Sequence, residues 1–155
     1  MKPLATPHVV RQLTDAPVPV RLKITALWAS VLFLYIYGDY FELYAPGKLR
    51  AMLAGRMALG AVSQAGLLGM AALMAIPSVM VALTLLLPAR LNRWVNFVLG
   101  LVYTGIMLLA IQGSWPFYQF YGALEMTLTL LISWYAWSWP RQLVPEGTDS
   151  SAGPR

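Results

Sequence analysis

The chain has 155 residues, of which 59% are hydrophobic and only 11% are charged. Soluble domains carry about a quarter charged residues, so this composition indicates an integral membrane protein that contacts the lipid bilayer. The net charge of +5 does not indicate a nucleic-acid partner, because the Lys and Arg residues lie between apolar runs and form no basic face. Cysteine is absent and the single histidine is His8, so we expect no disulfide, no metal site and no cofactor.

Four apolar runs follow one another along the chain. Residues 1–22 contain four prolines and no sustained periodicity, which predicts an irregular cytosolic arm. The first apolar run lacks a small-x-small cleavage site, so we expect a retained signal-anchor helix. About 20 residues cross a hydrocarbon core of about 30 Å. The sequence therefore predicts an all-α bundle of four transmembrane helices at about 23–44, 63–87, 91–112 and 116–139.

The segment between the first two spans is too polar to cross the membrane but has a helical rhythm. Leu49, Met52 and Leu53 fall on one side of this helix, and Lys48 and Arg56 reach water. This pattern predicts an interfacial amphipathic helix, with a long helical loop as the open alternative. Residues 141–155 are polar and rich in turn formers, so we expect a disordered tail.

The distribution of Lys and Arg predicts the orientation. Cytoplasmic segments carry an excess of these residues, and a cytoplasmic N-terminus gives the larger share to the inside. Both termini are therefore expected in the cytoplasm, in a bacterial inner (plasma) membrane. The inside residues are then Lys2, Arg11, Arg21, Lys23, Arg90, Arg93, Arg141 and Arg155, and the outside ones are Lys48, Arg50 and Arg56.

Two acids stand out in this apolar chain. Asp39 lies near the outer end of the first span, in "YIYGDYFELYAPG", and Glu125 lies within the fourth span. An ionised acid in mid-membrane costs about 2.5–3.5 kcal/mol, so Glu125 should face the bundle interior and find a partner or a proton. Tyrosines share faces with these acids at helical spacing. We expect an outer pocket lined by Asp39, Glu125, Tyr35, Tyr103, Tyr118 and Tyr121.

Structural explanations of these residues stay open. Tyr and Trp are enriched at both membrane interfaces whatever the function, and Glu42 is as well explained by contact with water. Asp39 either contributes to the site, caps the helix that begins near Pro46, or pairs with Lys48. The donors available to Glu125 for a purely structural role are Tyr103, Gln64 and Gln112.

Two further features concern the architecture. Pro77 interrupts the second span and frees a carbonyl, which predicts a kink. Asn92 and Asn96 lie one turn apart at the start of the third span, where they either tie helix ends together or bind a lipid phosphate.

Three segments resemble a known family. They are "LWASVLFLYIYGDYFELYAPG", "AIPSVMVALTLLLPARLNRWVNFVLGL" and "YGALEMTLTLLISWYAWSWP", which lie within residues 23–140. The resemblance is to a domain-of-unknown-function family (6326) of small four-span bacterial membrane proteins, similar in architecture to DoxX-like proteins. It implies a topology and marks Asp39 and Glu125, but it implies no activity.

Three classes of function remain open. Carboxylates and tyrosine faces in an apolar bundle favour a protein that binds or transports a small organic cation, acting as a homo-oligomer. A non-catalytic accessory or assembly subunit of a membrane complex is the alternative. An isomerase-type enzyme acting on a lipid ligand is the third, and the absence of a recognisable catalytic motif places it last.

Overall fold

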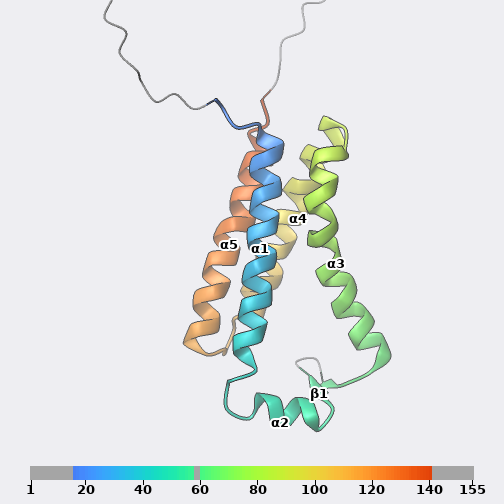
Figure 1. Cartoon of the computed structure of the whole chain (residues 1–155), viewed down its shortest axis with the longest axis vertical. Helices are drawn as coiled ribbons and strands as arrows, with labels where there is room; N and C mark the ends of the chain where they lie inside the picture. Colours follow the sequence, from blue (N-terminus) through green and yellow to red (C-terminus); the bar gives the residue numbers. More distant parts are fainter. Residues whose placement is uncertain (1–15, 58–59, 141–155) are drawn as a thin grey trace, which may run out of the picture.

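The computed structural model describes residues 16–57 and 60–140 (Figure 1). The expected tail at 141–155 and most of the expected N-terminal arm lie outside the described residues. The predicted all-α class is confirmed, because the described elements are helices apart from one short antiparallel strand pair. In chain order they are α1 (Val20–Glu42), α2 (Lys48–Leu53), β1 (Arg56–Met57), β2 (Gly60–Ala61), α3 (Gln64–Leu86), α4 (Ala89–Ala110) and α5 (Pro116–Trp137).

The long helices begin and end close to the expected spans. α1 begins at Val20, directly after the prolines of the arm, so residues 20–22 are helical rather than irregular. Within the described part of the chain, α1, α3 and α4 are long and apolar enough to cross a membrane. α5 has the same length as α4 but is not among these candidates, and it contains Gln119, Glu125 and several hydroxyl-bearing residues.

The segment between α1 and α3 corrects one expectation. The helical rhythm of this segment is realised only in the six residues of α2. Gly55 then takes the positive φ of +69° that ends the helix, and Arg56 pairs with Ala61 in the β1–β2 hairpin. The predicted helix is therefore present as α2, but it has fewer than two turns and is followed by a hairpin.

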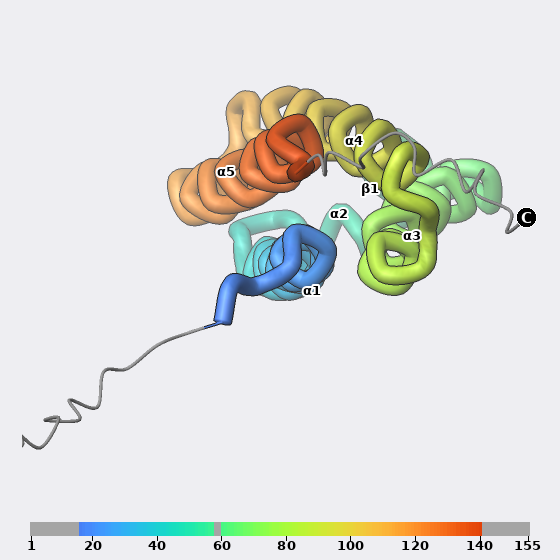
Figure 2. The backbone as a smooth tube through the Cα atoms, turned by 90° about the horizontal axis from the view of Figure 1, so that it is seen from above, coloured from blue at the N-terminus to red at the C-terminus, as the bar shows by residue number. Residues whose placement is uncertain are grey.

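The four long helices pack side by side in the order α4, α5, α1 and α3. α5 packs against both α4 and α1, and α3 packs chiefly against the other side of α1 (Figure 2). We call the end that holds the start of α1, the α3–α4 turn and the end of α5 the terminal end. The opposite end, with the end of α1, α2, the hairpin and the start of α5, is the α2 end (Figure 1).

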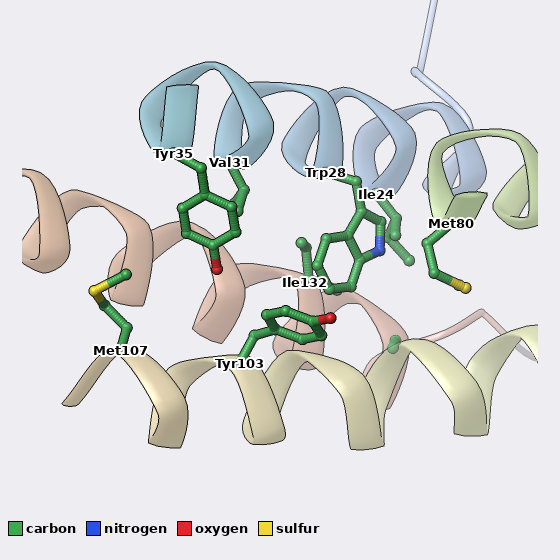
Figure 3. Close-up of a cluster of buried hydrophobic side chains, with 9 residues drawn as sticks. Ile24, Trp28, Val31, Tyr35, Met80, Tyr103, Met107 and Ile132 are labelled. Carbon is green, nitrogen blue, oxygen red and sulfur yellow. The ribbon is translucent and has the colours of Figure 1, made fainter. Parts of the chain in front are cut away.

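Large side chains fill the space between α1, α4 and α5. Trp28 is fully buried and packs edge-to-face on Tyr103, with ring centroids 5.8 Å apart (Figure 3). The outward faces are also apolar: Leu68, Leu86 and Leu109 are 68, 76 and 74% exposed. Apolar side chains both inside and outside are what a lipid-facing bundle requires.

The kink expected at Pro77 is visible in α3, whose first half swings away from α1 toward the α2 end (Figure 1). Pro77 has no N–H, so it leaves the carbonyl of Leu73, four residues earlier, without its helical donor. The Tyr103 hydroxyl of α4 donates to this carbonyl at 2.5 Å. The interruption in α3 is therefore closed by a side chain of another helix.

The two asparagines of α4 tie helices together at the terminal end. Both are fully buried. Asn96 Oδ1 accepts hydrogen bonds from Trp28 Nε1 at 2.7 Å and from Thr84 Oγ1 at 3.3 Å. Asn92 Nδ2 donates to the Thr84 carbonyl at 2.5 Å, and Asn96 Nδ2 donates to Asn92 Oδ1 at 2.6 Å. These four residues, the amide network, join α1, α3 and α4 and leave no asparagine free for a phosphate.

Candidate functional site

Glu125 occupies the interface between α5 and α1. It lies nine residues beyond Pro116, about 14 Å along the helix. Its side chain is 2% exposed, and its Oε2 has no hydrogen-bond partner among the described residues. A buried acceptor left unbonded costs about 1–3 kcal/mol, and more when it is charged. Such a carboxyl is poised to take up a proton or a cation.

Gly38 of α1 is the residue that faces Glu125 across the helix interface. A Cβ atom at this position would lie 3.9 Å from Glu125 Oε1 and 3.8 Å from Tyr121 Cβ, which is ordinary contact. Gly38 itself is buried, so a side chain larger than alanine here would occupy the space beside the carboxyl. The glycine in "YIYGDY" is thus a neighbour of the site that sequence reasoning missed.

The acids and two of the tyrosines lie within electrostatic range of one another. Tyr35 is buried and points from α1 into the bundle (Figure 3). Asp39 and Glu125 both lie near Tyr35 and Tyr118, and Asp39 lies near Glu125. Tyr121 lies beside Gly38. The structure therefore brings five of the six expected site residues together at the α2 end.

Tyr103 is the residue that the structure assigns elsewhere. Its hydroxyl donates to the Leu73 carbonyl and not to Glu125. Gln112, another expected donor, bonds to the Leu108 carbonyl of its own helix. Two of the three structural partners proposed from sequence for Glu125, Tyr103 and Gln112, are therefore engaged elsewhere.

Asp39 lines a cavity of about 350 Å³ between α1, α2, β1 and α3. Lys48 also lines this cavity, but its Nζ contacts Glu42 Oε1 at 2.6 Å. The pairing of Asp39 with Lys48 that the sequence left open is thus replaced by the Glu42–Lys48 pair. Asp39 forms no ion pair or hydrogen bond with any residue in 16–57 and 60–140. The remaining lining side chains are Ile36, Tyr40, Leu43, Met52, Met57 and Met70.

The three methionines were not among the expected site residues. They come from α2, β1 and α3, so no single periodic pattern in the sequence connects them. Methionine is flexible and polarizable, and it forms adaptable apolar surfaces around ligands. They give the Asp39 cavity an apolar wall opposite its carboxylate.

Comparison with known families decides the relationship of this chain. The model of a family of unknown function, DUF6326, matches residues 20–145. The chain belongs to this family. The match confirms the resemblance carried by the three sequence segments. No curated protein and no solved structure matches the chain.

The chemistry of this DUF6326 protein must therefore be inferred from its own side chains. Among the described residues, no group of three or more His, Asp or Glu side chains is arranged to hold a metal ion. The α2 end instead offers the Asp39 carboxylate in a cavity that it shares with the Glu42–Lys48 pair, the buried Glu125 carboxyl, and Tyr35 and Tyr118 near both acids. Such a site suits a compact organic cation, which gains ion pairing, cation–π contact and apolar packing together.

Proposed function

We propose that this chain is a multi-pass protein of the bacterial inner (plasma) membrane that binds a small organic cation at its α2 end. The observation that carries the proposal is the buried Glu125 carboxyl, whose Oε2 has no partner in the described residues. Asp39 follows Gly38, the neighbour of Glu125, and supplies a second carboxylate that has no ion pair among the described residues. A cation is the ligand that both groups favour.

In this proposal α5 is a fourth span. It has 22 residues, about 33 Å of helix, which is enough for a hydrocarbon core of about 30 Å. It also packs between α1 and α4, so its buried polar residues Glu125, Thr129 and Ser133 are shielded from lipid by two neighbours. The charge excess then puts the terminal end, with Arg21, Lys23, Arg90 and Arg93, in the cytoplasm.

The cation enters from the outer side in this arrangement. Asp39 attracts it into the Asp39 cavity, whose methionine wall contacts its apolar part. Glu125 stabilises the same charge from deeper in the bundle. The opposite charges of Glu42 and Lys48 neutralise each other, so this pair takes no direct part in binding.

A matched pair of probes tests cation binding. Benzyltrimethylammonium and its neutral carbon isostere, neopentylbenzene, have nearly the same shape and differ in charge. The cation should raise the melting temperature of the purified protein in detergent micelles, because a ligand that binds only the folded state stabilises it. The neutral isostere should raise it much less.

Variants at the α2 end assign the effect. Asp39→Asn and Glu125→Gln should each weaken the response to the cation at least fivefold in midpoint concentration. The double variant Glu42→Gln/Lys48→Gln is the matched control, since it removes both members of the neutral ion pair in the same cavity, and it should retain the response. Equal responses to both probes, or an unchanged response in Asp39→Asn, would overturn the proposal.

One outcome would favour the alternative of an accessory or assembly subunit. In that case neither probe shifts the melting temperature, while Asp39→Asn and Glu125→Gln weaken capture of a membrane partner. A transport path across the bilayer would need more helices around it than one small bundle supplies, so we propose a homo-oligomer as the transporting form. Chemical cross-linking in native membranes tests this.

A further inference from the structure

We propose that a groove between α4 and α5 at the terminal end binds an anionic phospholipid of the cytoplasmic leaflet. This inference uses the proposed topology but does not depend on the cation site. The groove has a volume of about 610 Å³ and shares no lining residue with the Asp39 cavity. Its lining residues are Phe97, Thr127, Leu130, Leu131, Ser133, Trp134 and Trp137.

The walls of the groove suit hydrocarbon. Its two hydroxyl side chains are already bonded within the protein, Thr127 to the Ala123 carbonyl and Ser133 to the Phe97 carbonyl. A polar molecule in the groove would therefore lose hydrogen bonds to water without replacing them. An acyl chain loses none.

The rim of the groove carries a positive charge at a fixed position. The Arg93 guanidinium lies over two indole rings, 5.4 Å from the centroid of Trp137 and 5.8 Å from that of Trp94. Trp137 thus both lines the groove and holds the arginine. Arg93 forms no ion pair with any described residue. Arg90, three positions earlier on the same helix, adds a second positive charge on that side.

The dimensions of the groove match one leaflet. From Trp137 to Thr127 is ten residues of α5, about 15 Å, which is half of a hydrocarbon core of about 30 Å. Arg93 lies four residues after Ala89, about 6 Å from the start of α4. A lipid whose phosphate contacts Arg93 therefore has its acyl chain directed along the groove.

Charge favours an anionic lipid over a second copy of the chain. A two-fold symmetric contact through this face would bring two copies of Arg93 into one interface without an acidic partner from the described residues of α4 or α5 near it. A phosphate group, in contrast, accepts two hydrogen bonds from one guanidinium. Basic sites between helices on the cytoplasmic side bind lipid head groups in this way.

Native mass spectrometry tests the proposal on the purified full chain. The protein is exposed to equal amounts of dioleoyl phosphatidylglycerol and dioleoyl phosphatidylcholine in detergent, and the retained lipid is counted. The wild type should retain phosphatidylglycerol at least fivefold more than phosphatidylcholine. Arg93→Gln should remove this preference, and Arg93→Lys should keep part of it because the charge remains.

Two further variants separate the head group from the acyl chain. Leu130→Trp should fill the groove and lower retention of both lipids while Arg93 is unchanged. Arg50→Gln is the control, since it removes an exposed charge at the opposite end, and it should bind like the wild type. Equal retention of the two lipids by the wild type, or an undiminished preference in Arg93→Gln, would refute the site. A dimer that forms only when lipid is absent would also refute it, because a second copy of the chain would then be the occupant of the groove. Because none of these readouts uses the cation probe, failure here leaves the Asp39 site standing.

Discussion

At the terminal end, buried polar groups from three helices bond to one another, whereas at the α2 end the deepest carboxyl has an oxygen with no partner among the described residues. Trp28, Thr84, Asn92 and Asn96 use their side chains to hold α1, α3 and α4 in register. Asp39 and Glu125 hold nothing in register. Polar residues within the same bundle thus serve structure at one end and remain available for chemistry at the other.

The backbone follows the same division. The first half of α3, which precedes the bend at Pro77, diverges from α1 (Figure 1). The cavity of Asp39 lies between these two helices. The second half of α3, after Pro77, is held to α1 by two hydrogen bonds. Thr25 donates to the Val81 carbonyl, and Arg21 donates to the Leu85 carbonyl. The terminal end therefore acts as the rigid support on which an opening at the α2 end is built.

The largest loss of stability is expected from Asn96→Ala. The substitution leaves Trp28 Nε1, Thr84 Oγ1 and the Asn92 amide without their shared partner. Each buried group left unbonded costs about 1–3 kcal/mol in water-soluble proteins, and interhelical bonds in membranes lie at the low end of this range. We expect the free energy of unfolding in mixed micelles to fall by about 3 kcal/mol.

The control for Asn96→Ala is Gln112→Ala. Gln112 is exposed, and its side chain bonds only to a carbonyl of its own helix, so a change below about 0.5 kcal/mol is expected. A similar loss in both variants would show that the amide network adds no more than an ordinary surface contact. In that case the two ends of the bundle would not differ in the way described.

A pair of glycine variants gives the next largest effect. At Gly100 a Cβ atom would lie 2.7 Å from the Thr129 carbonyl oxygen and would overlap Ser133 Oγ, so α4 and α5 must separate. At Gly38 the same atom would meet its neighbours at 3.8 and 3.9 Å, which is ordinary contact. We expect Gly100→Ala to lower the free energy of unfolding by about 2 kcal/mol. Gly38→Ala should instead raise it by about 0.5 kcal/mol through higher helix propensity.

The same unfolding measurement in mixed micelles compares these two variants. Helix propensity is matched between them, so the difference reports the packing at each position. Equal effects would mean that the α1–α5 contact beside Glu125 is as tight as the α4–α5 contact. The space beside Glu125 would then be too small to admit a ligand group.

Much of this fold was predictable from the sequence, for definable reasons. Hydropathy and span length predicted the four long helices, and helical spacing placed Tyr35 and Asp39 near one another. The choice of Glu42 rather than Asp39 as the partner of Lys48 was not predictable, because the two acids lie one turn apart and side-chain conformation decides between them. The length of α2 depended on the backbone angle of Gly55, and helical rhythm does not report that angle.

The assignment of Tyr103 shows a different limit. Its spacing with Met107 correctly placed it on a buried face of α4. Periodicity, however, reports which face a residue occupies and not which atom on another helix needs a donor. Pro77 marks the Leu73 carbonyl as free, but the pairing with Tyr103 requires the crossing of α3 and α4 to be known.

The smallest predicted effect tests that pairing, which lies at the boundary between the two ends. Tyr103→Phe removes the donor to the Leu73 carbonyl and should lower the free energy of unfolding by about 1 kcal/mol. In a Pro77→Ala background, residue 77 regains its N–H and bonds this carbonyl within α3. Tyr103→Phe should then cost almost nothing, which gives a coupling energy of about 1 kcal/mol in the double-mutant cycle. If the cost is the same in both backgrounds, the hydroxyl does not compensate for the proline, and the bend in α3 is stabilised by side-chain packing alone.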